Sequence, residues 1–204
     1  MKLYHSPGAC SLAPHIVARE AGLPLTLVNV DIIGDHKLKD GTDYYGINAR
    51  GYVPMLELDD GSRHTEASAL IQYLSDLAPK TGLMPAAGSM ERFKVQQWIG
   101  FVATELHKGF SPYLWRQDTP EETKKIAIAG LHKRFAELDK ALAGKSYLTG
   151  ETFTAADAYA FTTVNWVNFL GIDISAYKNL SAFMARVAAR PKVQEALKAE
   201  GLVQ

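Results

Sequence analysis

The sequence predicts two domains, a mixed α/β domain followed by an all-helical one. Through about residue 79, short β-rich runs alternate with helical runs, whereas the later residues show helical periodicity alone. Proline and glycine crowd the stretch that joins the two parts, as they do in linkers, at Pro79, Gly82, Pro85 and Gly88. We therefore place the first domain at residues 1–79 and the helical domain at residues 89–204.

The first domain is expected to combine a βαβ unit with a ββα unit. The βαβ unit comprises a strand, a helix and a second strand, at residues 2–4, 11–21 and 25–30. After a polar stretch come two short strands joined by a tight turn, and then a closing helix, at residues 55–58, 63–64 and 65–77.

The second domain is expected to contain helices only. Apolar residues recur at helical spacing over residues 89–115, 121–142, 154–170, 179–189 and 191–199. Thr154 and Asp157 have the spacing of a capping box, in which each side chain bonds the backbone of the other residue. We interpret this pair as a structural feature that carries no chemistry.

Composition excludes several classes of protein. The chain carries 22 Lys and Arg against 22 Asp and Glu, so no net charge draws it to nucleic acid or to an anionic membrane. A single cysteine cannot form an intramolecular disulfide, and no apolar leader opens the chain, which indicates a cytoplasmic protein. The histidines lack metal-binding spacing and no stretch is apolar enough to span a membrane, so neither a metal nor a membrane partner is expected.

Cys10 is the first candidate for chemistry. It lies at the start of the first predicted helix, where the helix dipole and unpaired N–H groups favour an anion such as a thiolate, its own or a ligand's. Ser11 is expected to cap that helix with its side chain. The alternative is that Cys10 is a small residue used for packing.

Two other segments can bind a ligand through their backbone. Pro54 lacks an N–H, so the extended residue before it, Val53, keeps its main-chain groups for a peptide-like ligand, unless the segment is only a rigid turn. At the start of the next helix, the N–H groups near Ala67 favour an anion and the carboxylate of Glu66 favours an ammonium, unless these residues only cap the helix.

The helix expected near residues 95–111 has two different faces. Its apolar stripe continues to Phe110, and the opposite face is small, polar and basic: Gly100, Thr104, His107, Lys108 and Ser111. That face either meets solvent or lines a cleft against the first domain. In the second case His107 and Lys108 can hold a carboxylate or assist an acid–base step.

Taken together, these segments resemble the bacterial beta-class glutathione transferases. The matching motifs span the chain: Tyr4, SPGACS at residues 6–11, GYVP at 51–54, LDDG at 58–61, Thr65-Glu66, and ATELHKGF at 103–110. The resemblance implies a thioredoxin-like first domain that holds glutathione, a helical domain that forms the pocket for an electrophile, and a homodimer.

The resemblance also implies roles for residues of the first domain. Cys10 lies beside the glutathione sulfur, Val53 pairs its backbone with the cysteinyl part of the tripeptide before a cis Pro54, and Glu66 with Ala67 holds the γ-glutamyl end. Either His36 or Lys37 takes the glycyl carboxylate.

In the helical domain, the resemblance assigns Thr104, Glu105 and His107 to the stretch that lines the rest of the glutathione site. Cys10 and His107 are then the two catalytic candidates. The electrophile pocket is implied at Lys108, Phe110, Tyr113, Trp115 and Trp166.

The leading hypothesis is an enzyme of detoxification that conjugates the thiolate of glutathione, its co-substrate, to small hydrophobic electrophiles. Two alternatives stay open. Cys10 can carry glutathione-dependent thiol–disulfide exchange or peroxidase activity, or the chain is a glutathione-binding protein without catalysis.

Overall fold

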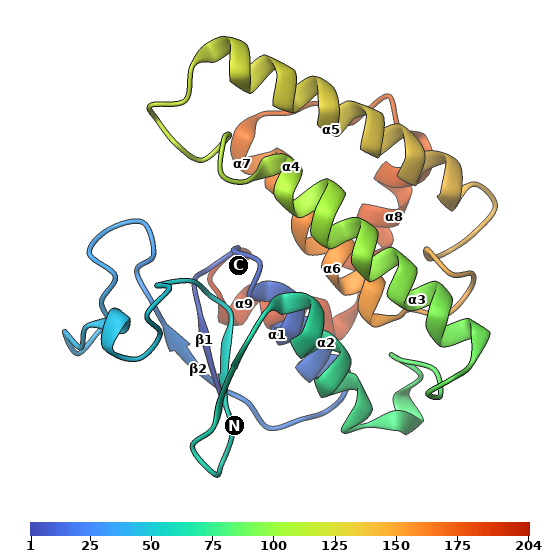
Figure 1. Cartoon of the computed structure of the whole chain (residues 1–204). Helices are drawn as coiled ribbons and strands as arrows, with labels where there is room; N and C mark the ends of the chain where they lie inside the picture. The colour runs from blue at the N-terminus through green and yellow to red at the C-terminus, as the bar shows by residue number, and fades with distance from the viewer. The chain divides into compact units, whose positions relative to one another are not determined.

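The structure, a computed structural model, describes residues 1–204 and divides them into two compact units. The first unit joins Met1–Leu83 to the C-terminal segment Arg190–Gln204, and the second is Met84–Ala189. The sequence-based boundary, which placed residues 190–204 in the helical domain, is therefore corrected. Helix α9 (Pro191–Ala199) packs on α1 (Leu12–Glu20), as Figure 1 shows.

An ion pair with α1 holds the C-terminal segment in the first unit. Arg190 donates from Nε and Nη2 to the carboxylate of Glu20 at 2.7 and 2.8 Å. The apolar side of α9 is buried as well, at Val193, Ala196 and Leu197. The bidentate ion pair and the apolar burial hold α9 in the first unit, although the helix that precedes it in the sequence belongs to the second unit.

The first unit contains one mixed sheet of four strands in the order β2-β1-β3-β4. Strand β1 (Lys2–His5) is parallel to β2 (Thr26–Asn29), and β3 (Met55–Glu57) is antiparallel to β1 and to β4 (Arg63–Thr65). Helix α1 connects the two parallel strands, and α2 (Ala67–Asp76) follows β4 and packs on α1. The predicted βαβ-ββα order is thus present.

A buried cluster positions the backbone around Val53. Tyr4 from β1 and Met55 from β3 pack with Val30, Tyr44 and Val53. Successive residues of a strand point to opposite faces, so Leu3, which is fully buried, packs on the face of the sheet opposite to Tyr4. Tyr44 belongs to a short 3₁₀ helix, η1 (Tyr44–Gly46), within the polar stretch for which the sequence predicted no element.

The second unit consists of helices and their connections. They are α3 (Met90–Phe101), a π-helical segment η3 (Val102–His107), α4 (Lys108–Phe110), α5 (Glu121–Leu142), α6 (Ala155–Val164), α7 (Trp166–Leu170) and α8 (Lys178–Ala188). Helix α3 packs on α6, and α5 packs on α4 and α8. A further 3₁₀ turn, η2 (Pro79–Thr81), lies in the first unit near the predicted linker.

Two predicted helices are interrupted. The helix expected over residues 89–115 changes to π geometry at Val102 and ends at Phe110. The helix expected over 154–170 is divided at Asn165. A constant rotation of 100° per residue cannot detect a π segment, because its wider turn inserts an extra residue between hydrogen-bonded partners.

The predicted capping box begins α6, a helix that is buried on every side. Asp157 accepts hydrogen bonds from the backbone N–H and hydroxyl of Thr154 and from the N–H of Leu148, each at 2.8 Å. Burial still outweighs these bonds and raises the pKa of Asp157 to about 6. No helix in the chain is both long and apolar enough to cross a membrane.

Candidate active site

Cys10 lies in the loop between β1 and α1, one residue before the N-cap of the helix. Its thiol Sγ donates to the carbonyl oxygen of Val53 at 3.2 Å. Ser11 does not cap α1 with its side chain, which corrects the sequence-based expectation. Its hydroxyl instead bridges the backbone N–H and C=O of Ser6, both at 3.2 Å, and so closes the loop that carries the thiol.

Val53 precedes a cis peptide bond to Pro54, as the resemblance implied. The carbonyl of the residue before it, Tyr52, accepts hydrogen bonds from the hydroxyl of Tyr44 at 2.9 Å and from the Nδ2 amide of Asn48 at 2.7 Å. No hydrogen bond within the chain engages the N–H of Val53. The loop therefore holds this backbone in place and leaves its donor for another partner.

Glu66 lies at the start of α2 in a left-handed conformation, with φ of 70°. The helix begins at Ala67, later than predicted, because Thr65 still belongs to β4. No side chain caps α2, so the first N–H groups of the helix keep their hydrogen-bonding capacity. Ala67 is buried and can offer only its backbone. The Glu66 carboxylate is exposed and pairs with Arg50 at 3.0 Å.

The side chains of His36 and Lys37 make different contacts. His36, with φ of 56°, stacks on Tyr45 at a ring distance of 4.8 Å. A Cβ at Gly51 would lie 2.6 Å from Cε1 of Tyr45 and 3.0 Å from Cδ2 of His36, so both rings pack against the segment that leads to Val53. Lys37 pairs with Asp35 at 2.9 Å and lines a different pocket of the first unit, of about 350 Å³.

In the second unit, His107 ends the π segment and is held by aromatic side chains. Its Nδ1 lies 2.7 Å from the hydroxyl of Tyr159. The ring also meets Trp166 edge-to-face at 5.1 Å. Burial, with a smaller effect from the charge of Lys108, lowers the pKa of His107 to about 4. The imidazole is therefore neutral at neutral pH, so any carboxylate held here as an ion pair is held by Lys108.

The neighbouring site candidates differ in whether their side chains are accessible or already paired. Glu105 is engaged by Arg134 of α5 at 2.9 Å. Thr104 is exposed and its hydroxyl donates to the carbonyl of Gly100 at 3.1 Å. Lys108 is exposed as well. Thr104 and Lys108 are therefore accessible to a ligand, whereas Glu105 must share its carboxylate with Arg134.

The aromatic candidates form a connected series that leads from the core to the surface. Phe110 is fully buried and packs on Trp166, and Trp166 in turn contacts Trp115 at 5.6 Å. Trp115 and Tyr113 are 43% and 49% exposed, so they offer surface to a ligand. Phe110 supports Trp166 from behind and presents no surface of its own.

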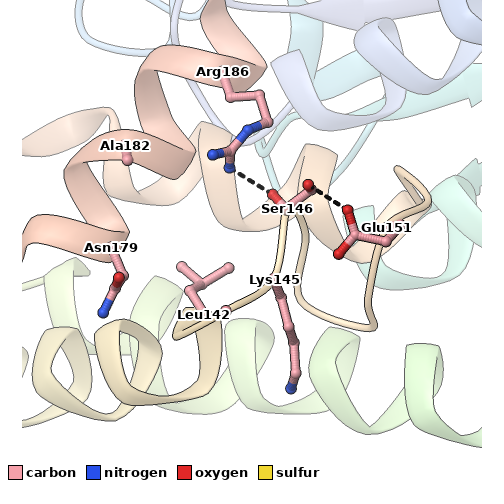
Figure 2. Close-up of a pocket in the computed structure, with 8 residues that line it drawn as sticks. Leu142, Lys145, Ser146, Glu151, Asn179, Ala182 and Arg186 are labelled. Atoms are coloured by element: carbon pink, nitrogen blue, oxygen red, sulfur yellow. Dashed lines mark hydrogen bonds between the residues drawn. The ribbon is translucent and has the colours of Figure 1, made fainter.

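The helical unit also has an open pocket of about 370 Å³ that contains none of the predicted site residues. Figure 2 shows two pairings among its polar groups: Arg186 donates to the carbonyl of Ser146, and the Ser146 hydroxyl donates to Glu151. Lys145 extends away from these groups. Asn179 donates to the backbone and carboxylate of Asp139. The pocket therefore has no converging set of free groups that would select a ligand.

Comparison with known proteins decides the family. Residues 8–77 match the family model for the glutathione S-transferase N-terminal domain, and residues 101–191 match that for the C-terminal domain. Glutathione S-transferase GstA of Escherichia coli O157:H7 is 46% identical, over 99% of this chain and 100% of its own length. The chain belongs to the glutathione S-transferase family.

Comparison with solved structures identifies the class within this family. The ternary complex of BphK, a bacterial glutathione transferase, superposes with a TM-score of 0.95 at 46% identity, covering 99% of this chain and 100% of that one. The bacterial beta-class transferase of Sphingomonas chungbukensis superposes with a TM-score of 0.94 at 42% identity, covering both chains fully. The resemblance to the beta class is confirmed, and with it the thioredoxin-like and all-helical architecture, the transferase activity and glutathione as co-substrate.

Sequence reasoning missed Glu200, which lies behind the Cys10 loop of the transferase. Its carboxylate has no exposed surface and accepts from the N–H of Gly8 at 2.9 Å and from Nδ1 of His15 at 2.8 Å. Nδ1 of His5 is 3.7 Å away, is buried and has no hydrogen-bond partner. No local pattern in the sequence links residue 200 to residue 8. No three His, Cys, Asp or Glu side chains group closely enough to hold a metal.

Proposed function

We propose that this transferase conjugates glutathione to small hydrophobic electrophiles, with the tripeptide bound by the first unit. The hydrogen bond from Cys10 Sγ to the carbonyl of Val53 carries the proposal. It brings the thiol at the start of α1 beside the backbone that precedes cis-Pro54, the two groups that the resemblance assigns to the cysteinyl part of glutathione. In the reaction the glutathione thiolate attacks the electrophilic carbon, the thioether bond forms, and the leaving group departs with the electron pair.

Three groups of the first unit are proposed to fix the tripeptide. The free N–H of Val53 donates to the cysteinyl carbonyl. Glu66 takes the γ-glutamyl ammonium, and the uncapped N–H groups of α2 near Ala67 take the γ-glutamyl carboxylate. Arg50, which pairs with Glu66, neutralises that carboxylate until the ligand arrives.

His36 is proposed as the contact for the glycyl carboxylate, in preference to Lys37. His36 packs with Tyr45 against Gly51, next to the Val53 backbone. Lys37 pairs with Asp35 and lines another pocket of the first unit. Replacing His36 by Ala should therefore weaken glutathione binding, whereas Lys37→Ala should leave it unchanged, and the reverse result would assign the role to Lys37.

The helical unit is proposed to supply the electrophile pocket. Trp115 and Tyr113 present exposed aromatic surface, Trp166 and Phe110 support it, and Lys108 adds a cation beside it. His107 is proposed to act in the reaction, and Thr104 and Glu105 to contribute to glutathione binding.

We further propose that the enzyme is a cytoplasmic homodimer. Met90 and Phe93 of α3 are 60% and 55% exposed, which is unusual for large apolar side chains on one helix. A Phe93→Glu variant should be monomeric in sedimentation analysis if this face joins two copies.

Thiol–disulfide exchange is the second candidate, because Cys10 is a partly accessible thiol that forms no disulfide. Its thiolate would attack a glutathione mixed disulfide, form a Cys10–glutathione disulfide and release the other thiolate. A second glutathione thiolate would then attack that disulfide, release Cys10 and leave as oxidised glutathione.

Initial rates with glutathione and a chlorodinitrobenzene, for the native protein and Cys10→Ser, test these proposals together. We expect saturable thioether formation in both proteins, with a rate that falls as the pH drops through the range in which bound glutathione becomes protonated. Exchange with hydroxyethyl disulfide should be lost in Cys10→Ser. No rate above the uncatalysed reaction in either protein, despite measurable glutathione binding, would overturn the conjugation proposal.

A further inference from the structure

Tyr159 contacts a catalytic candidate, although no motif of the sequence singled it out. It lies on α6, is 2% exposed, and its hydroxyl is 2.7 Å from Nδ1 of His107. The two rings are nearly perpendicular, at 89°, and Trp166 meets the imidazole at 75°. The imidazole is therefore fixed in its plane by two aromatic neighbours, and one of its two nitrogens is committed to Tyr159.

The remaining question is which atom of this pair carries the proton. The imidazole is neutral at neutral pH, because burial lowers the pKa of His107 to about 4, so it has a single N–H. A phenol is a better hydrogen-bond donor than a neutral imidazole, and the imidazole lone pair is the better acceptor. The 2.7 Å contact is accordingly an O–H···N bond from Tyr159 to Nδ1, and the ring proton lies on Nε2.

A second tyrosine–histidine pair in the same unit shows the opposite arrangement. The hydroxyl of Tyr177 donates to the backbone carbonyl of His132 at 3.1 Å and lies 3.0 Å from Nδ1 of that residue. A hydroxyl has one proton, so Nδ1 of His132 must donate to Tyr177. This pair is an internal reference with the reverse tautomer.

We infer that Tyr159 is a positioning residue that holds His107 as the Nε2–H tautomer, so that His107 acts as a neutral hydrogen-bond donor to the anion formed in the reaction. This inference rests on the proposed role of His107 in conjugation. A neutral donor stabilises a thiolate or a departing anion but does not take up the thiol proton, which therefore passes to solvent.

The tautomer is tested directly by nitrogen NMR of protein with labelled histidine, at neutral pH and without substrates. We expect His107 to show an unprotonated Nδ1 and a protonated Nε2, and His132 to show the reverse. In Tyr159→Phe, which keeps the ring and removes the hydroxyl, His107 should become a mixture of tautomers. A protonated Nδ1 in native His107, or an unchanged spectrum in Tyr159→Phe, would overturn the inference.

Kinetics test the consequence for the reaction. We expect Tyr159→Phe to lower kcat about twofold for an equal mixture of tautomers, with little change in the KM for glutathione, because the rate falls with the fraction of His107 that still carries its proton on Nε2. Tyr177→Phe, the matched control, should retain native kcat. Equal kcat in native protein and Tyr159→Phe would count against the positioning role. Absence of conjugation in the native enzyme would instead count against the proposed function, while the spectra still decide the tautomer.

Discussion

Glu200 accepts a hydrogen bond from Nδ1 of His15 at 2.8 Å, and neither side chain has any exposed surface. Nε2 of His15 faces Arg19, whose guanidinium can only donate, so the imidazole proton must lie on Nδ1 and point to Glu200. The other carboxylate oxygen accepts from Gly8 in the loop that carries Cys10. The carboxylate at the C-terminal end of α9 thus supports the loop that carries Cys10.

Replacing Glu200 by Ala should strongly destabilise the protein. Two buried donors, the N–H of Gly8 and Nδ1–H of His15, would lose their acceptor, and each unsatisfied group costs about 1–3 kcal/mol. We expect the free energy of unfolding in urea to fall by roughly 2–6 kcal/mol. The control is Glu195→Ala on the same helix, where an exposed pair with Lys192 is lost and the change should stay below about 1 kcal/mol. Equal effects of the two variants would show that the buried carboxylate is not a structural anchor.

Gly109 should be intolerant of a side chain. A Cβ there would lie 2.8 Å from Cδ2 of Leu131, which is buried on α5. Gly109→Ala should therefore force α4 and α5 apart and lower stability by about 1–3 kcal/mol. Gly130→Ala, on α5 with open space around it, should instead raise stability by up to about 1 kcal/mol through helix propensity. Thermal unfolding of both variants checks this, and a stabilised Gly109→Ala would refute the steric argument.

Glu66→Gln should weaken glutathione binding. If the carboxylate holds the γ-glutamyl ammonium, losing its charge removes a charged hydrogen bond and should raise the Kd by roughly 10-fold or more. Asp60→Asn, an exposed carboxylate of the neighbouring turn, is the matched control and should bind normally. Calorimetric titration with glutathione distinguishes them, and an unchanged Kd in Glu66→Gln would place the ammonium elsewhere.

His107 should make the native protein sensitive to acid. Its pKa is lowered from 6.5 to about 4 in the folded state, so the unfolded chain binds more protons between these values. The stability that the neutral imidazole retains above pH 6.5 is therefore lost as the pH falls towards 4. Urea unfolding of native protein and His107→Gln should show a larger loss in the native protein over this range. Asp157 titrates in both proteins, so its effect cancels. Parallel pH profiles would mean that His107 is not shifted.

Local patterns in the sequence determined most of the secondary structure and part of the site. Helices α5 and α9 begin and end where apolar periodicity placed them. The capping box of Thr154 and Asp157 and the cis bond before Pro54 were also anticipated, the second from the family resemblance. The helix bounds and the capping box depend on neighbouring residues, so a short window of sequence contains that information.

The tertiary structure alone decided the state of two polar side chains, His107 and Glu200. His107 is neutral because burial lowers its pKa to about 4, and its Nδ1 contacts the hydroxyl of Tyr159, 52 residues further along the chain. Glu200 reaches the N–H of Gly8 across 192 residues of sequence. Desolvation and long-range hydrogen bonds arise only when distant segments pack together, and no local pattern of residue types encodes which partner each buried polar group will find.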